Sequence, residues 1–325
     1  MTPTLVPGRM DRADARARDW AEIQERMLVP LYEAVYERLD VGCQTRLLGL
    51  SCGSGLALLM AAARGATVTG VDFDEQRLAL ARERLFSEPQ RGAAQAQLFC
   101  GGPEQARQQC EAPPLRAVAG DGRASLRREA PPLRAVAGDG QASLRREAPP
   151  LRAVAGDGRA YERSGQLYTM VTAFEPATPH TELGPALIEA ARLAERGSAV
   201  VVTGWGPPER CATARVLRMA ERLAEPEQRP SPEPAWVSGR DDLEELARAA
   251  GLGLDGSGRV ACPFTYPDMD SAVRGLLSTG LFDTAVAASD QSQVEKELTE
   301  ALHPYRRPDG MVHMDNVFRY LIARV

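Results

Sequence analysis

The sequence predicts an α/β protein whose mostly parallel sheet is covered by helices on both faces. Short apolar runs alternate along the chain with helical patterns, as they do where helices connect parallel strands. Residues 46–74 contain a strand, a turn of small residues, a helix and a second strand in succession. The 325 residues are 44% hydrophobic, which suits one large domain or one domain with a cap.

The chain opens with a helical segment ahead of the first strand. Residues 18–39 read RDWAEIQERMLVPLYEAVYERL, and Pro30 interrupts them. The apolar side chains at near-helical spacing are Trp20, Ile23, Met27, Leu31 and Val35. We therefore expect two short helices, with the break at Pro30.

The next segment is suited to hold a nucleoside. An apolar run, Leu47 to Leu50, meets the turn Ser51 to Gly55, and a second strand, Ala66 to Val71, ends in Asp72. Glycines let the backbone approach a ligand closely, and the start of the following helix offers unpaired N–H groups. A carboxylate at the tip of the second strand can accept both ribose hydroxyls.

This segment, RLLGLSCGSGLALLMAAARGATVTGVDFD, resembles the cofactor motif of class I S-adenosylmethionine (SAM) methyltransferases. That motif runs hydrophobic-Asp-hydrophobic-Gly-x-Gly-x-Gly, and an acidic residue closes the second strand. Gly53, Gly55 and Asp72 are in register with it, whereas Gly49 replaces the motif acid and Ser51 the first glycine. A nicotinamide site would need G-x-G-x-x-G, but Leu58 stands at the third position.

The resemblance implies a Rossmann-like class I sheet with an antiparallel final strand, an N-terminal helical cap and SAM as cofactor. The motif acid helps to orient the methionine end of SAM, so both departures fall at that end. The residues that we expect to contact the cofactor are Leu50, Ser51, Cys52, Gly53, Gly55, Asp72, Phe73, Asp157, Gly158 and Ala173.

A nearly perfect repeat follows the helix after Asp72. Residues 111–158 contain an 18-residue unit, EAPPLRAVAGDGRASLRR, in two full copies and one partial copy. Repeats are typical of solenoids, but copies this similar inside a single-domain pattern favour a recent tandem duplication. The basic excess of this region indicates a solvated face, with an RNA or partner site as the alternative.

Each copy offers a strand, Leu-Arg-Ala-Val-Ala, followed by Gly-Asp-Gly, and only one copy can be the third strand of the sheet. The final copy, Leu151 to Asp157, lies a normal connection length before the next strand, Leu167 to Phe174. We therefore expect Asp157 near the adenine, with Asp121 and Asp139 on a surface insertion of about residues 87–148.

The remaining pattern alternates as an α/β sheet requires. The expected strands are Ala199 to Trp205, Arg259 to Phe264 and Val317 to Val325. The expected helices are Leu183 to Glu195, residues 209–224, Asp241 to Ala250, Met269 to Leu277 and residues 291–302. We divide the chain into a cap (1–40), a SAM-binding core (41–205) and lid helices with the end of the sheet (206–325).

Acid and base candidates lie in the loop after the fourth strand. Ligands of open α/β sheets bind beyond the carboxyl ends of the strands, and this loop, TAFEPATPHTELG, holds Glu175 and His180. Either could take a proton from a nucleophile, although methyl transfer does not require a base. The alternatives are loop hydrogen bonding or a helix N-terminus for His180, and cofactor contact or solvent exposure for Glu175.

Aromatic residues could form the walls of a substrate pocket. Trp20, Tyr32 and Tyr36 lie in the predicted cap, and Trp205 ends the fifth strand. Trp205 could also present its π-face to the sulfonium. The alternative is that the first three pack the cap helices and that Trp205 packs under the Pro207–Pro208 turn.

Composition narrows the remaining classes. A net charge of −5 argues against a general nucleic-acid binder, and neither a membrane span nor a signal peptide is indicated, so we expect a cytoplasmic protein. Six scattered cysteines without a C-x-x-C pair and three separated histidines predict neither disulfides nor a metal site. Lys296 is the only lysine, and this strong arginine bias suggests a GC-rich, for example actinobacterial, genome.

The first functional hypothesis is a SAM-dependent methyltransferase that acts on a partly apolar small molecule by O-, N- or C-methylation, in specialised metabolism. It would be a monomer or a homodimer. Gly49 and Ser51 motivate the second hypothesis, a degenerate SAM-fold protein that binds SAM, S-adenosylhomocysteine (SAH) or a partner without methylating.

Overall fold

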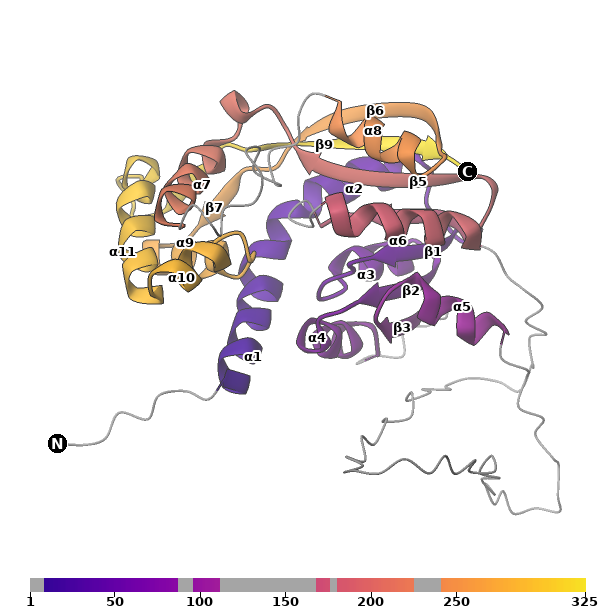
Figure 1. Ribbon diagram of the computed structural model, residues 1–325, viewed down its shortest axis with the longest axis horizontal. Coiled ribbons are helices and arrows are strands. Elements are labelled where there is room, and N and C mark those ends of the chain that lie inside the picture. The colour runs from indigo at the N-terminus through magenta and orange to yellow at the C-terminus, as the bar shows by residue number, and fades with distance from the viewer. Residues whose placement is uncertain (1–8, 87–95, 112–167, 176–179, 225–240) are drawn as a thin grey trace, which may run out of the picture. The chain divides into compact units, whose positions relative to one another are not determined.

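The computed structural model describes residues 9–86, 96–111, 168–175, 180–224 and 241–325. The chain divides into two compact units, one formed by Met1–Glu111 with Ser164–Val325 and the other by Ala112–Arg163. The second unit holds nearly all of the repeat and lies outside the described residues. The described residues all belong to the first unit (Figure 1).

A seven-stranded sheet in the order β3-β2-β1-β4-β5-β9-β6 forms the centre of this unit. The strands are β1 (Arg46–Leu50), β2 (Thr67–Asp72), β3 (Ala96–Cys100), β4 (Tyr168–Ala173), β5 (Ala194–Trp205), β6 (Gly253–Ala261) and β9 (Val317–Arg324). The first five run parallel, and β9 is antiparallel to both β5 and β6. The predicted Rossmann-like sheet with an antiparallel final strand is confirmed. Strand order reverses between β1 and β4, which is where ligands of such sheets bind.

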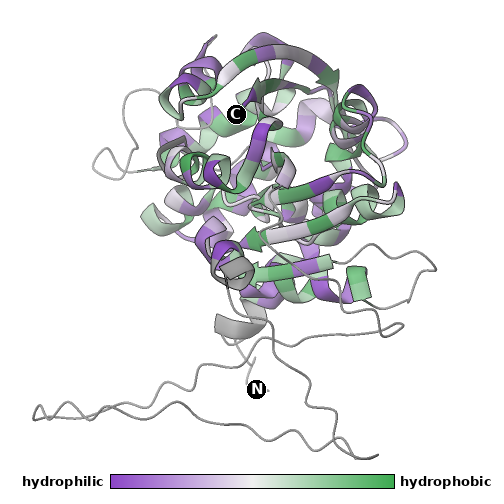
Figure 2. Ribbon diagram, turned by 90° about the vertical axis from the view of Figure 1, so that its right-hand side faces the viewer, coloured by the Kyte–Doolittle hydropathy of each residue, from purple (hydrophilic) through white to green (hydrophobic). Residues whose placement is uncertain are grey.

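Helices cover both faces of the sheet because successive strand residues point to opposite sides. Leu47 of β1 joins a core with Leu31 and Leu58, whereas Leu48 joins a second core with Leu187. The first core includes α2 (Val29–Arg38) and α3 (Leu56–Ala63). The second includes α5 (Pro103–Glu111), α6 (His180–Leu193) and α8 (Asp242–Ala249). Figure 2 shows hydrophilic and hydrophobic residues mixed along the helices around the sheet.

The N-terminal segment packs against helices from the end of the chain. It consists of α1 (Arg9–Asp19), a π-helical turn (Trp20–Gln24), a 3₁₀ turn (Glu25–Leu28) and α2. The Tyr266 hydroxyl donates to Gln24 Oε1 over 2.9 Å, and Asp19 pairs with Arg274. The late elements are α7 (Ala212–Leu223), α9 (Met269–Leu277), α10 (Asp283–Ala288), α11 (Gln291–Leu302) and the hairpin β7 (Phe264–Tyr266) with β8 (Val312–Met314).

The break between the N-terminal helices differs from the prediction. It covers Trp20–Leu28, and Pro30 lies in the first turn of α2. Proline is tolerated there because the first helical N–H groups have no partner within the helix. The break therefore lies upstream of Pro30, and it carries Trp20 and Glu25 toward the sheet.

Both edge strands of the sheet were predicted wrongly. The strand beside β2 is Ala96–Cys100, not the repeat-derived segment Leu151 to Asp157, and residues 96–111 belong to the sheet and its helix rather than to the insertion. At the other edge β6 begins at Gly253, before the expected start at Arg259, and ends at Ala261. Edge strands need fewer apolar residues, and most side chains of β3 and β6 are half-buried or exposed.

Candidate functional site

The turn after β1 keeps a left-handed backbone at three positions. The φ angles are +45° at Ser51, +57° at Gly53 and +79° at Gly55. A Cβ at Gly55 would lie 2.8 Å from the Cβ of Ala81, so the close packing of α3 on α4 (Glu75–Phe86) requires glycine there. Ser51 adopts a left-handed φ that glycine favours, at a cost of about 1–2 kcal/mol.

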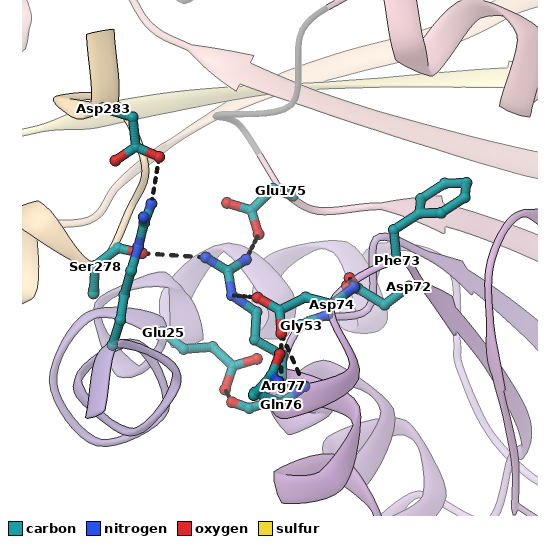
Figure 3. A network of polar contacts seen from close by, with 12 residues as sticks. Glu25, Gly53, Asp72, Phe73, Asp74, Gln76, Arg77, Glu175, Ser278 and Asp283 are labelled. Carbon is teal, nitrogen blue, oxygen red and sulfur yellow. Dashed lines mark hydrogen bonds and ion pairs between the residues drawn. The ribbon is translucent and has the colours of Figure 1, made fainter. Parts of the chain in front are cut away.

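Asp72, at the tip of β2, holds the turn from the neighbouring strand. Its Oδ2 accepts the Gly53 N–H over 2.7 Å and its Oδ1 accepts the Asp74 N–H over 2.9 Å (Figure 3). Burial raises the pKa of this carboxyl, while the two backbone donors act in the opposite direction. Each carboxylate oxygen has a second lone pair, so Asp72 can still accept two hydroxyl groups.

An acid at position 49 of β1 would require Leu58 to move. A Cβ on Gly49 would lie 2.9 Å from Leu58 Cδ2, so the end of the Leu58 side chain occupies the space beside this position. Two carboxylates from other elements approach this region instead. Glu25 comes from the 3₁₀ turn of the cap, and Glu175 follows β4.

Glu25 is 2% exposed and joins the cap to the turn and to α4. It accepts from the Ser54 hydroxyl, from Arg84 Nη1 over 2.5 Å and from the Leu56 N–H over 3.4 Å. Arg84 also donates to the carbonyls of Ser54 and Ala21 over 3.0 and 2.6 Å. Burial raises the pKa of Glu25, and the Arg84 charge opposes the rise. Both carboxylate oxygens therefore have partners within the protein.

Glu175 is held differently, through one oxygen only. Arg77 Nη1 donates to Glu175 Oε2 over 3.1 Å (Figure 3). The Arg77 guanidinium lies 4.4 Å from the centre of the Trp20 ring. Glu175 Oε1 and Trp20 Nε1 are both buried without a hydrogen-bond partner. Burial raises the pKa of Glu175 to about 7, and Arg77 lowers it less than burial raises it.

These groups line one pocket at the carboxyl ends of β1 and β4. It brings together seven residues that were predicted for the site, namely Trp20, Tyr32, Leu50, Ser51, Cys52, Gly53 and Glu175. Gly49, Glu25, Ala57, Leu58, Thr172 and Phe174 complete the lining. The pocket is apolar along Leu58, Tyr32 and Phe174 and polar at the two glutamates. Such a lining suits a ligand that has both apolar and charged parts.

Other predicted residues lie away from this pocket. The Tyr36 hydroxyl donates to the Ala57 carbonyl over 2.9 Å within the core, and Trp205 packs on Phe318 with ring centres 4.6 Å apart. These are the contacts expected under the alternative interpretation, in which both residues serve packing. Ala173 is buried in β4 and does not line the pocket. Asp157, Gly158 and the side chain of His180, the first residue of α6, lie outside the described residues.

A second exposed surface lies beside Asp72. Phe73 is 80% exposed, and its ring approaches Gly102 after β3. No acid follows this third strand, because Gly101 and Gly102 stand there. The Gln105 carboxamide lies against Gly101, and its Oε1 is buried without a partner. An aromatic face and a buried acceptor are thus available close to the tip of β2.

Residues 48–107 match the family model described as a methyltransferase domain. This part of the chain is similar to a methyltransferase domain. The match covers the turn, Asp72 and the strand β3, and it confirms the resemblance to SAM-dependent methyltransferases, with SAM as the cofactor.

Solved structures of similar chain path include YcgJ from Bacillus subtilis, with 12% identity, TM-score 0.46 and coverage of 90% of this chain and 98% of that one. A SAM-dependent methyltransferase from Thiobacillus denitrificans in complex with SAH has 14% identity and TM-score 0.44, and the match covers 98% of this chain and 100% of that one. Magnesium protoporphyrin IX methyltransferase from Synechocystis with bound SAH has 10% identity and TM-score 0.43, covering 98% and 89%. The assignment does not depend on these distant likenesses. A search of curated proteins gives no match.

Several charged residues that were not predicted from the sequence lie at the pocket wall. Glu25, Ser54, Arg77 and Arg84 were not candidates, although they organise the pocket wall. One signal was available, since Arg77 and Arg84 are seven residues apart and so lie on one face of a helix.

The described residues contain no group of three or more His, Cys, Asp or Glu residues that could hold a metal ion. None of the helices within the described ranges is long and apolar enough to cross a bilayer.

Proposed function

We propose that this protein transfers the methyl group of SAM to a partly apolar small molecule. The observation that carries the proposal is the pocket between the glycine turn and β4, whose wall combines Tyr32, Phe174 and Leu58 with the buried carboxylate of Glu175. A purely polar substrate would gain little from this wall, because burial of apolar surface supplies most of the affinity in such pockets.

The residues present fit the nucleoside of SAM. Asp72 offers two free lone pairs to the ribose hydroxyls, Phe73 offers an exposed ring face to the adenine, and Gln105 Oε1 offers an acceptor to its amino group. Gly53 leaves the pocket side of the turn without a side chain where the ligand would pass. The orphaned Gln105 oxygen supports this fit, because a buried acceptor without a partner destabilises the protein until a donor binds.

The SAM sulfonium supplies an electrophilic methyl group, and the protein has to position the acceptor in line with it. Positioning alone can supply several kcal/mol of the barrier reduction. Tyr32 and Phe174, with ring centres 4.9 Å apart, form an aromatic wall of the pocket. His180 begins α6 close in sequence to Glu175, and its role as a base stays part of the proposal.

Calorimetry with SAM and SAH tests the cofactor part of the proposal. We expect binding of both, and loss of binding in Asp72→Ala because the ribose acceptors and the anchor of the turn disappear together. Leu254→Ala is the control, since this residue of β6 is exposed. Absence of heat and of a thermal shift at millimolar ligand would overturn the enzyme assignment for this chain.

The second candidate function is binding without methyl transfer, and the filled space at Gly49 favours it. With Gly49 at the position of the motif acid and Leu58 beside it, β1 offers no carboxylate, so the methionine end of the cofactor has to be held by other groups. Mass spectrometry of cell extracts incubated with the protein and isotopically labelled SAM separates the two. A product that gains one CH₂ unit supports the enzyme, whereas tight SAM binding without any labelled product supports the binding protein.

A further inference from the structure

Two buried polar atoms in the pocket have no partner within the protein. Trp20 Nε1 is a donor on a residue that is 4% exposed, and Glu175 Oε1 is an acceptor on a side chain that is 9% exposed. Buried polar groups without partners are rare in native proteins and often mark functional sites. One donor and one acceptor therefore stand ready for a ligand in the same pocket.

Arg77 contacts both groups. Its guanidinium lies over the Trp20 ring, donates to Glu175 Oε2 over 3.1 Å and to the Ser278 carbonyl over 3.2 Å, and forms an ion pair with the Asp74 carboxylate at 3.6 Å. Its effect is to orient Trp20 and Glu175, so that the indole N–H and the second carboxylate oxygen remain for another molecule.

The two groups flank the turn end of the pocket. Trp20 Nε1 lies 3.1 Å from the place that a Cβ would take on Gly53, and Glu175 follows β4, which pairs with β1 at Gly49 through Thr172. Glu25 has no oxygen left for a ligand, because both of its oxygens already accept hydrogen bonds from Ser54, Arg84 and Leu56. Glu175 is thus the carboxylate with a vacant oxygen in the pocket that Gly49 also lines.

An α-amino acid group has the complementary chemistry, since its ammonium needs an acceptor and its carboxylate needs a donor. We propose that Glu175 Oε1 receives the ammonium and Trp20 Nε1 the carboxylate of an amino-acid end, with Glu175 taking the role of the acid that β1 lacks. The inference rests on the proposed function, in which this end is the methionine portion of SAM.

Three ligands and two variants test this assignment by calorimetry. SAH has both charged groups, decarboxylated SAH has only the ammonium, and 5′-methylthioadenosine has neither. Glu175→Gln should weaken binding of SAH and of decarboxylated SAH by about tenfold to a hundredfold, and leave 5′-methylthioadenosine unchanged. Trp20→Phe should weaken SAH by about tenfold and leave the other two ligands unchanged.

Matched variants control for the substitutions themselves. Glu195→Gln removes another arginine-paired carboxylate, at the opposite end of the parallel strands, and Trp205→Phe alters another buried indole that does not line the pocket. Neither should change the affinity for any of the three ligands. Unchanged binding of 5′-methylthioadenosine also shows that each variant is folded.

The outcomes separate this inference from the proposed function. If the wild-type protein binds neither SAH nor 5′-methylthioadenosine, both fail. If it binds both, and Glu175→Gln weakens them equally or not at all, the amino-acid site is wrong while the cofactor assignment stands. A loss confined to the ligands that carry the ammonium supports the site.

Discussion

Glu25 and Glu175 are two buried carboxylates that α4 holds by the same means, an arginine, with different results. Glu25 pairs with Arg84, and both of its oxygens accept hydrogen bonds from the protein. Glu175 pairs with Arg77, and one of its oxygens accepts none. Complete satisfaction makes the first carboxylate a structural link between cap and turn. Incomplete satisfaction leaves the second available to a ligand, at a cost in stability that the fold has to carry.

The largest effect is expected from breaking the satisfied pair. Glu25→Ala leaves Arg84 buried without its counter-charge, so the free energy of unfolding should fall by about 3–5 kcal/mol. Urea denaturation measures it. The double variant Glu25→Leu with Arg84→Met should recover much of the loss, since an apolar pair needs no counter-charge. A loss below about 1 kcal/mol in the single variant would show that Glu25 is not a structural link.

A smaller effect tests why the acid has left β1. Gly49→Ala places a Cβ 2.9 Å from Leu58 Cδ2, and the overpacking should cost about 1–3 kcal/mol in unfolding free energy. Gly42→Ala is the matched control, because the nearest atom to its Cβ would be 3.8 Å away. Equal stability of the two variants would mean that Leu58 can move aside and that β1 could accommodate an acid.

The vacant oxygen of Glu175 predicts a pH dependence. Because burial raises its pKa to about 7, the folded protein holds a proton that the unfolded chain, with a glutamate pKa of 4.5, releases earlier. Stability should therefore fall by about 2 kcal/mol as pH rises from about 5 to about 7. Burial also raises the pKa values of Glu25 and Asp72, which contribute in the same direction.

Comparison with Glu175→Gln isolates the contribution of this residue, because the difference in unfolding free energy between the two proteins should vary over that pH window. A constant difference would contradict the prediction. The affinity of wild type for SAH should rise over the same window, since an ionised Glu175 attracts the ammonium.

The smallest expected effect concerns the turn between the two glutamates. Ser51→Gly relieves the left-handed strain at φ +45° but makes the unfolded chain more flexible, so the net gain should be about 0.5–1 kcal/mol. Thermal unfolding measures it. Ser54→Gly is not equivalent, because the Ser54 hydroxyl donates to Glu25 and its loss should destabilise the protein. A destabilised Ser51→Gly would show that the serine side chain contributes to the turn.

The sequence could predict what depends on neighbouring residues in the chain. Helix α9 has the predicted ends, Met269 and Leu277, and β1 and β2 differ from prediction by one residue at their starts. The edge strands β3 and β6 escaped prediction because few of their side chains are buried. The strand-like sequence of the repeat, Leu151 to Asp157, was therefore predicted as the third strand in place of AQLFC.

The same distinction separates the site residues that were predicted from those that were missed. Residues of the turn and Asp72 were predicted from their spacing, which the close approach of backbone to ligand requires. Glu25 and Arg84 were missed because a charged residue on a helix has the same sequence pattern whether it faces solvent or a buried partner. Their partners are distant in the chain, and only the fold brings them together. The same holds for the contact of Arg77 with Trp20.

The spacing of the two arginines on α4 has a further consequence. Seven residues of α-helix separate Arg77 from Arg84, which corresponds to about 10.5 Å along the axis and nearly two full turns. Insertion or deletion of one residue between them would rotate one guanidinium by about 100° away from its glutamate. The number of residues between Arg77 and Arg84 should therefore be intolerant of change. The identity of the outward side chains on this stretch of α4 should matter less than its length.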